Sequence, residues 1–311
     1  ARWSATEALW RDICLAFAAD HEMADKDAAL RRFADALAAS LESARHDPAF
    51  AAELLKAPNA AELAQRASVI DPSRIEAGRK RVRETVAQSL KDQLHAIYRE
   101  LSTNEAYDPG PEQAGKRSLR NAALSLLVAG GEYALAEEQA ETAQNMTDEA
   151  AATAAIAMSE APSRERLLQR FYMKWRSDTL VANKWLAWRA MAPADRALDE
   201  VRALLAHEAF DIKTPNKVRA LIGVFANQNL SGFHRADGYG YDFLAEQMLA
   251  IDKLNPQLAA RLTTALESWR KLEPARRRGA EAALRKIAER SDLSANLFEM
   301  ASRLLADDNP A

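Results

Sequence analysis

The sequence predicts an all-α fold in which antiparallel helical hairpins stack into a curved, superhelical solenoid. Apolar residues recur at spacings of three and four, as in Val82, Val86 and Leu90, whereas alternation at a spacing of two never lasts for a strand's length. Short links between amphipathic helices favour antiparallel neighbours. Many successive hairpins cannot surround one centre, so they are expected to form an extended array.

Helices in the first half follow from apolar stripes and start signals. Ser4 and Glu7 predict a capping box before the stripe of Trp10 and Ile13, and Asp47-Pro48 and Asp71-Pro72 predict two further helix starts. Gly130-Gly131 ends one helix and leads into the next. The predicted ranges are 4–18, 26–45, 48–56, 60–67, 72–101, 116–129, 132–142 and 148–158.

The second half continues the pattern. Thr214-Pro215 and Asn255-Pro256 predict two helix starts, and the stretch from Asn227 to Gly240, which contains three glycines, is predicted to be irregular. Loops on a rigid scaffold often contain binding groups. The predicted ranges are 163–175, 179–191, 195–206, 215–226, 240–253, 256–270, 274–289 and 294–305.

A chain of 311 residues suits two lobes or one elongated array. We expect residues 1–311 to form a single α-superhelical domain, with a candidate internal break near 103–115, where Asp108-Pro109-Gly110-Pro111 is the least helical segment. The first residue is Ala1 and a helical pattern is present by Trp3. The chain is therefore expected to be part of a longer one.

Composition and charge exclude several classes of protein. The 42 Lys and Arg against 45 Asp and Glu give a net charge of −3, which disfavours nucleic acid as a partner. No stretch reaches the roughly 20 apolar residues that span a bilayer, and the first residues given do not have the basic, apolar and small-residue pattern of a signal sequence, so no membrane partner is expected. The single cysteine, Cys14, lies on an apolar stripe and favours a reducing, cytoplasmic location.

A search for catalytic motifs finds only fragments. His21-Glu22 and His207-Glu208 each lack the second histidine of a zinc-binding helix, and His46, His95 and His234 are far apart in the sequence. There is no Gly-x-Ser-x-Gly elbow and no phosphate-binding glycine loop. We therefore expect no catalytic residue and no metal ligand in this chain. An independent enzyme remains an alternative only if the dispersed histidines converge in space.

Other conspicuous residues have structural explanations. The basic runs Arg79-Lys80-Arg81 and Arg276-Arg277-Arg278 are interpreted as solvated helix faces, and the tryptophans as core. His234 and Asp237 resemble a catalytic pair, but the Asp-Gly turn explains them structurally. Asn121 is interpreted as a helix or packing residue.

Local motifs in a fixed order nevertheless indicate a family. The later motifs are Pro215-Asn216-Lys217-Val218-Arg219, Leu221 to Ala226, Phe233-His234, Asp237 to Tyr241, and Asn255-Pro256-Gln257 with Arg261; the earlier ones are Lys116 to Asn121, Asn145 to Asp148 and Asn183-Lys184-Trp185. Together they resemble the C-terminal helical domain of bacterial-type aminopeptidase N, a gluzincin zinc metallo-aminopeptidase. Lys217 and Met173 depart mildly from the family pattern.

The resemblance implies an armadillo- or HEAT-like superhelix that encloses the active-site cavity of a preceding catalytic domain. That domain would be the partner, would hold the His-Glu-x-x-His zinc site and would act on peptide substrates, whereas this fragment would bind no zinc and would be inactive alone. Residue by residue, the resemblance assigns substrate binding to Gln257, Arg261 and, more weakly, Arg219.

The residues themselves support this assignment modestly. Gln257 and Arg261 are neighbours at i and i+4 near the start of a helix capped by Asn255, and an amide with a guanidinium suits a peptide's carbonyls and carboxylate. The alternative interpretation is structural: Gln257 would be an ordinary surface residue, and Arg261 would form an ion pair with a glutamate. The competing function is a free-standing helical-repeat scaffold that binds proteins or peptides along one face.

Overall fold

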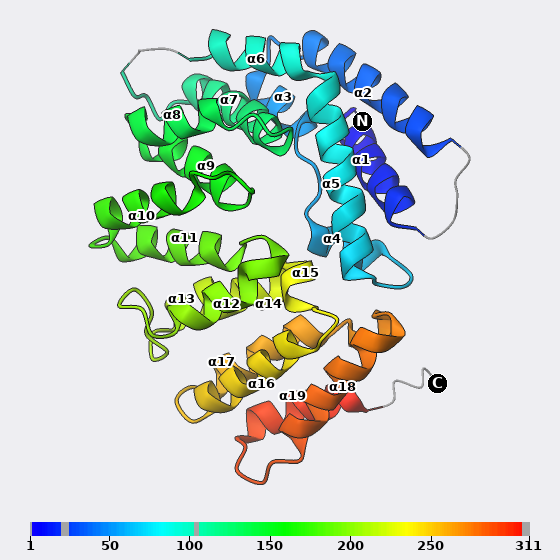
Figure 1. Ribbon diagram of the computed structural model, residues 1–311, viewed down its shortest axis with the longest axis vertical. Coiled ribbons are helices and arrows are strands. Elements are labelled where there is room, and N and C mark those ends of the chain that lie inside the picture. Colours follow the sequence, from blue (N-terminus) through cyan, green and yellow to red (C-terminus); the bar gives the residue numbers. More distant parts are fainter. Residues whose placement is uncertain (1, 20–24, 103–105, 307–311) are drawn as a thin grey trace. The chain divides into compact units, whose positions relative to one another are not determined.

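The computed structural model describes residues 2–19, 25–102 and 106–306. Over these residues the regular structure is helical, apart from one isolated bridge between Ile70 and Leu272 (Figure 1). The predicted all-α class is confirmed. No helix in these ranges is long and apolar enough to cross a bilayer.

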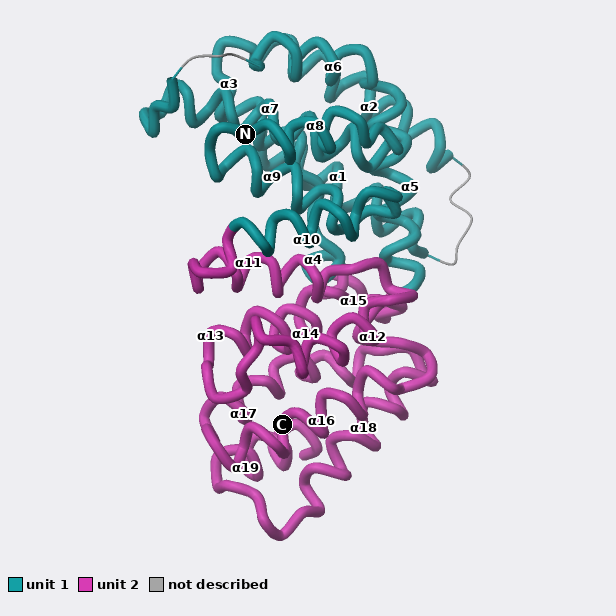
Figure 2. The backbone as a smooth tube through the Cα atoms, turned by 60° about the vertical axis from the view of Figure 1, so that its left-hand side comes forward, with its two compact units in different colours: residues 1–63, 73–174 teal, residues 64–72, 175–311 magenta. Residues whose placement is uncertain are grey.

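Two compact units make up the chain (Figure 2). Unit 1 comprises Ala1–Leu63 and Ser73–Lys174, and unit 2 comprises Ala64–Pro72 and Trp175–Ala311. Both sides of the stretch 103–115 lie in unit 1, and residues 103–105 of that stretch are outside the described part. The assignment of the whole chain to one domain, with a break in this stretch, stays a prediction.

The first ten helices lie between Arg2 and Trp175. Their bounds are α1 Arg2–Ala18, α2 Lys26–Ser43, α3 Pro48–Leu54, α4 Ala60–Arg66, α5 Pro72–Ser89, α6 Lys91–Glu100, α7 Pro111–Ala129, α8 Ala134–Thr142, α9 Met146–Ala157 and α10 Arg164–Trp175.

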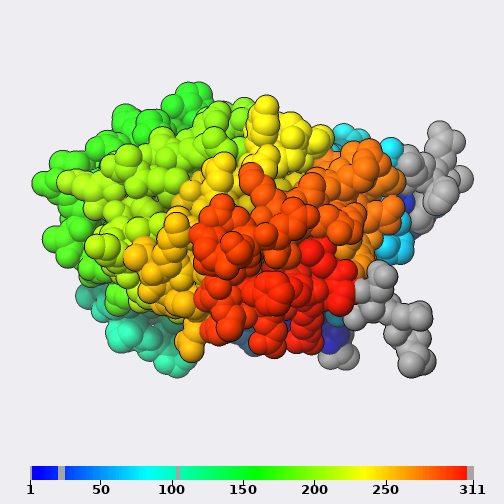
Figure 3. All heavy atoms as spheres, turned by 90° about the horizontal axis from the view of Figure 1, so that it is seen from below, coloured from blue at the N-terminus to red at the C-terminus, as the bar shows by residue number. Residues whose placement is uncertain are grey.

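The remaining helices begin at Thr179. They are α11 Thr179–Ala190, α12 Ala194–Leu204, α13 Pro215–Val218, the π-helical turn η1 Arg219–Gly223, α14 Val224–Gln228, α15 Leu230–Phe233, α16 Tyr239–Asp252, α17 Pro256–Leu262, the 3₁₀ turns η2 Thr263–Leu266 and η3 Trp269–Lys271, α18 Pro274–Ala288 and α19 Ala295–Leu305. α18 and α19 pack on each other, and Figure 3 shows them together on the surface in orange to red.

Several predicted boundaries are wrong. Helix α1 is already helical at Arg2, so Ser4 is an interior residue and not a cap. The predicted helix 72–101 breaks at Leu90, whose backbone departs from helical geometry (φ −101°, ψ 9°) although its side chain stays buried. The helix predicted from residue 116 begins at Pro111, because proline is favoured at a first helical position.

The proline-marked starts are confirmed as boundaries. Asp47 and Asn255 accept hydrogen bonds from the amides of Phe50 and Leu258, as N-caps do. Thr214 precedes its helix without capping it, since its hydroxyl donates to Asp211 at 2.7 Å.

Unit 1 contains a close helix crossing and a polar network. A methyl group on Gly78 of α5 would lie 2.8 Å from the carbonyl oxygen of Cys14, so the two backbones touch where only glycine fits. Cys14 is fully buried, as predicted, and burial raises the pKa of its thiol to about 12. Trp10 packs edge-on to Phe33 with the ring centroids 5.0 Å apart.

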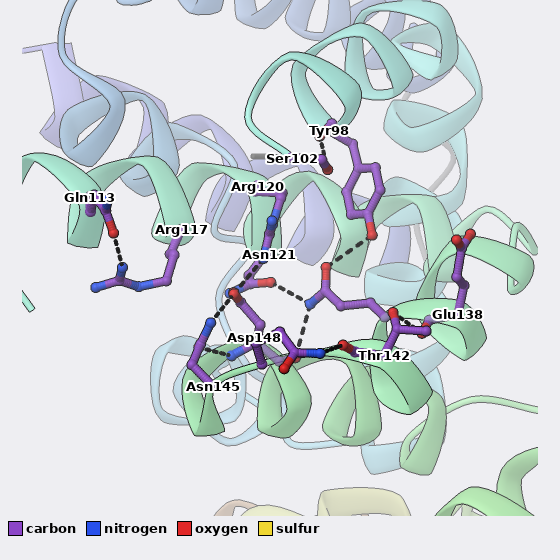
Figure 4. A network of polar contacts seen from close by, with 12 residues as sticks. Tyr98, Ser102, Gln113, Arg117, Arg120, Asn121, Glu138, Thr142, Asn145 and Asp148 are labelled. Carbon is purple, nitrogen blue, oxygen red and sulfur yellow. Dashed lines mark hydrogen bonds and ion pairs between the residues drawn. The ribbon is translucent and has the colours of Figure 1, made fainter. Parts of the chain in front are cut away.

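The network joins α6, α7, α8 and α9. Asp148, only 4% exposed, accepts from Asn121 and Asn145 and pairs with Arg120; these side chains point toward one another in Figure 4. Buried Gln139 of α8 donates to the carbonyl of Asp148 at 2.9 Å. The network satisfies polar groups that would be costly to bury alone.

Candidate functional site

The segment formed by α13, η1 and α14 has one buried and one exposed face. Its buried side chains recur at helical spacing and are Val218, Leu221, Ile222, Phe225 and Ala226. On the opposite face, Arg219 and Asn227 are exposed and Gly223 is half-exposed. These three residues form a row at i, i+4 and i+8.

A π-helical turn shapes this row. The amide of Val224 donates to the carbonyl of Arg219, five residues back, which is the π pattern. The turn packs against α11. Single π turns inside α-helices occur frequently at functional sites, so the exposed side of Arg219–Gly223 is a candidate binding surface.

Helix α17 and the turn η2 provide a second row. Leu258, Ala259, Ala260 and Leu262 are buried, and α17 packs against α16 and α19. The exposed residues are Gln257, Arg261 and Thr264, at i, i+4 and i+7. The helix geometry therefore places both residues singled out in the sequence on one exposed face, together with a threonine.

The two rows meet at their C-terminal ends. The hydroxyl of Thr264 lies 3.2 Å from Oδ1 of Asn227 and 2.9 Å from the carbonyl oxygen of Arg261. Nδ2 of Asn227 donates to the carbonyl of Gly223 at 2.9 Å. We call Arg219, Gly223, Asn227, Gln257, Arg261 and Thr264 the two-row surface.

The guanidinium groups of this surface have no acidic partner among the residues that the structure describes. Arg219 donates to the neutral amide oxygen of Asn216 at 2.8 Å, and across the described ranges neither Arg219 nor Arg261 forms an ion pair with a carboxylate. By contrast, Arg285 is paired with Glu281 at 2.7 Å. The two-row surface therefore offers two positive charges and neutral amides, which suit an anionic or carbonyl-rich ligand.

Sequence reasoning found Gln257, Arg261 and Arg219 but missed Asn227 and Thr264. The structure brings Arg261 and the Arg219 row together through these two residues. The sequence signal that could have found them is helical spacing, since Thr264 follows Arg261 by three residues and Asn227 follows Arg219 by eight. The substrate-binding role of the three predicted residues stays a prediction.

His234 and Asp237 do not form a catalytic pair. Nδ1 of buried His234 lies 3.0 Å from the hydroxyl of Tyr241, and burial, followed by the charge of Arg276, lowers the pKa of His234 to about 3. Asp237 pairs with Arg235, which lowers the pKa of that carboxyl group. Asp237 also accepts from the amide of Tyr239 at 3.1 Å, beside Gly238, whose φ is +80°.

The other histidines are likewise dispersed. Nδ1 of His207 accepts from the amide of Ala209, and the His21-Glu22 fragment lies outside the described residues. No group of three His, Cys, Asp or Glu side chains in the described part is arranged to hold a metal ion. Several residues of the basic runs form ion pairs, as in Arg81 with Asp27 and Arg276 with Asp71.

A family model and several proteins match this chain. Residues 1–306 match the family described as Domain of unknown function (DUF3458_C) ARM repeats. Aminopeptidase N of Escherichia coli (strain K12) is 36% identical over 308 residues, covering 98% of this chain and 35% of that protein. Aminopeptidase N of Caulobacter vibrioides is 37% identical, with 98% and 35% covered.

A solved structure agrees with these matches. The crystal structure of Legionella pneumophila aminopeptidase A in complex with aspartic acid matches with a TM-score of 0.85 and 26% identity, over 98% of this chain and 36% of that one. The chain thus spans about a third of the length of its relatives. It belongs to the DUF3458_C family of ARM-repeat domains and, as its sequence motifs indicated, is a relative of bacterial aminopeptidase N.

Proposed function

We propose that this chain is the C-terminal helical domain of a zinc-dependent aminopeptidase that removes N-terminal residues from peptides in the cytoplasm. In this proposal the chain encloses the active-site cavity and binds peptides through Gln257, Arg261 and Arg219. The zinc ion and the groups that act on the peptide bond belong to the catalytic domain of the same polypeptide.

The observation that supports a peptide-binding role most directly is the two-row surface. A guanidinium recognises a carboxylate or a carbonyl oxygen, and a glutamine amide both donates to and accepts from a peptide backbone. In the described part of the chain, neither arginine is neutralised by a carboxylate, so both charges are available to a ligand. The similarity to aminopeptidases supports peptide hydrolysis as the reaction of the intact protein.

Substitutions in the intact enzyme test this role. Arg261→Ala should raise KM for a tetrapeptide about tenfold or more, since a charge-assisted hydrogen bond contributes roughly 1.5–3 kcal/mol. Gln257→Ala should raise it about two- to tenfold, since a neutral hydrogen bond contributes roughly 0.5–1.5 kcal/mol, and both variants should leave the zinc content unchanged. The control is Arg285→Ala, because Arg285 is exposed and paired on another helix. Unchanged KM in both variants would contradict peptide binding by this surface.

The coding sequence offers a second test. The proposal expects it to continue upstream of Ala1 into a segment with a His-Glu-x-x-His motif. An upstream sequence without such a motif would favour the free-standing scaffold instead.

A further inference from the structure

We propose that Asn227 and Thr264 are positioning residues that fix Arg261 relative to the Arg219 row, and thereby set how the two-row surface holds a peptide. This inference rests on the proposed function and extends it to two residues that do not belong to the predicted set.

The carboxamide of Asn227 connects the two rows. Its Nδ2 donates to the carbonyl of Gly223, at the end of the π turn, and its Oδ1 faces the hydroxyl of Thr264 at 3.2 Å. Both ends of the amide are therefore engaged, one within its own segment and one across to η2. An amide held at both ends has a single orientation.

Thr264 lies between Asn227 and the backbone of Arg261. Its hydroxyl has one proton, which is directed either to Asn227 Oδ1 or to the carbonyl oxygen of Arg261, at 3.2 and 2.9 Å. Thr264 is the second residue of the 3₁₀ turn η2, which directly follows α17. When this proton is donated to Asn227, Thr264 ties η2, which directly follows the end of α17 that contains Arg261, to the segment that contains Arg219.

The link between Asn227 and Thr264 adds little to the stability of the fold. Asn227 and Thr264 are both exposed, so water would satisfy their polar groups equally well if the contact were broken. The core beneath them, with Leu221, Phe225 and Leu262 buried, already holds the helices together. The link instead fixes the position of the row that contains Arg261 relative to the row that contains Arg219.

The length of the Arg219 row sets which substrates can reach along it. From Arg219 to Asn227 there are eight steps along the chain, or at most about 12 Å at the rise of an α-helix, which equals up to four residues of an extended peptide. A substrate with one residue and a small leaving group does not reach along such a row. A positioning effect should therefore appear with a tetrapeptide and be absent with an aminoacyl amide.

The experiment measures kcat and KM of the intact enzyme for a tetrapeptide and for an aminoacyl amide. Asn227→Ala and Thr264→Val should each raise KM for the tetrapeptide about three- to tenfold with little change in kcat, and KM for the amide should stay constant. The double variant should be no worse than either single one, because both break the same link. Thr264→Ser retains the hydroxyl and should restore the tetrapeptide KM.

Matched controls remove a similar group elsewhere. Asn296→Ala deletes an exposed helical amide, and Thr142→Val deletes an exposed hydroxyl that donates within its own helix to the carbonyl of Glu138. Neither should change KM for the tetrapeptide. A melting curve of each variant shows whether the fold is intact.

The outcomes separate the two proposals. If Arg219→Ala and Arg261→Ala raise the tetrapeptide KM but Asn227→Ala and Thr264→Val do not, the positioning role is overturned and the proposed function stands. If none of the four variants changes it, the proposed function fails as well. If the Asn227 and Thr264 variants change KM for both substrates and lower the melting temperature more than the controls do, their role is structural and the inference is overturned.

Discussion

Asn121 Nδ2 lies 2.9 Å from Oδ1 of Asp148, and this hydrogen bond joins α7 to α9 (Figure 4). The other end of the same amide accepts from Gln139 of α8 at 2.8 Å. One side chain thus connects three helices of unit 1. From the sequence Asn121 is interpreted as a helix or packing residue, and these hydrogen bonds give it a structural role.

Replacement of Asn121 by alanine should lower the free energy of unfolding by about 1–3 kcal/mol, because buried Asp148 and Gln139 each lose a partner. Asn121→Asp should be worse, since it places a second carboxylate beside Asp148. Urea denaturation followed by circular dichroism measures both. Asn296→Ala, on an exposed helix face, should change stability by less than about 0.5 kcal/mol. Equal effects of Asn121→Ala and Asn296→Ala would show that the network adds no stability.

His234 predicts a pH dependence of stability. Burial and the charge of Arg276 lower its pKa from 6.5 to about 3, so the folded protein keeps this imidazole neutral while the unfolded chain protonates it below about pH 6.5. The unfolded state then binds more protons, and stability falls as pH decreases from about 6.5 towards 3. The slope is at most about 1.4 kcal/mol per pH unit.

Unfolding at pH 7 and pH 5 tests this, with His234→Gln as the variant that cannot titrate. The native protein should lose about 2 kcal/mol more than the variant between these two values. If His234→Gln does not fold, an NMR titration of the native protein replaces it, and the His234 ring signal should not shift above pH 4. A midpoint near 6.5 would contradict the burial argument.

At Gly240, the addition of a single methyl group should strongly lower the stability of the protein. A Cβ at this position would lie 1.9 Å from the carbonyl oxygen of Phe233, which is a backbone atom and cannot move aside easily. Gly240→Ala should therefore destabilise the protein by more than about 2 kcal/mol.

Gly223 is the matched control, because a methyl there would meet nothing nearer than 3.8 Å. Gly223→Ala should leave thermal stability unchanged or raise it by about 0.5–1 kcal/mol, since alanine favours a helix. A calorimetric scan of both variants makes the comparison. Similar melting temperatures for the two variants would refute the close approach at Phe233.

Local signals made most helices predictable, whereas contacts between distant segments were not. Asp47 and Asn255 cap the helices that their sequences predict, because a cap needs only three neighbouring residues. The break at Leu90 has no glycine or proline to mark it, and the π turn at Arg219–Gly223 lies inside an uninterrupted helical pattern. In each case the surrounding tertiary packing, not the local residues, decides the backbone.

The same distinction applies to the site. Gln257 and Arg261 are four residues apart, so helix geometry alone puts them on one face. Asn227 and Thr264 are 37 residues apart, and only the packing of α14 against η2 brings them together. A single sequence has no signal for that distance, so the link could be found only in the structure.

The proposed function assigns the zinc ion and the reaction to a separate catalytic domain. It therefore predicts that this chain alone does not hydrolyse aminoacyl substrates when zinc is added. The described residues offer no group of three metal ligands, and the buried His234 lies against Tyr241 with a lowered pKa. The assay compares an aminoacyl-nitroanilide with and without zinc, and a melting curve with and without a chelator. We expect no turnover above the rate in buffer and the same melting temperature in both. Zinc-dependent cleavage by the purified chain would place the reaction in these residues after all, because the catalytic domain is then not present to supply it.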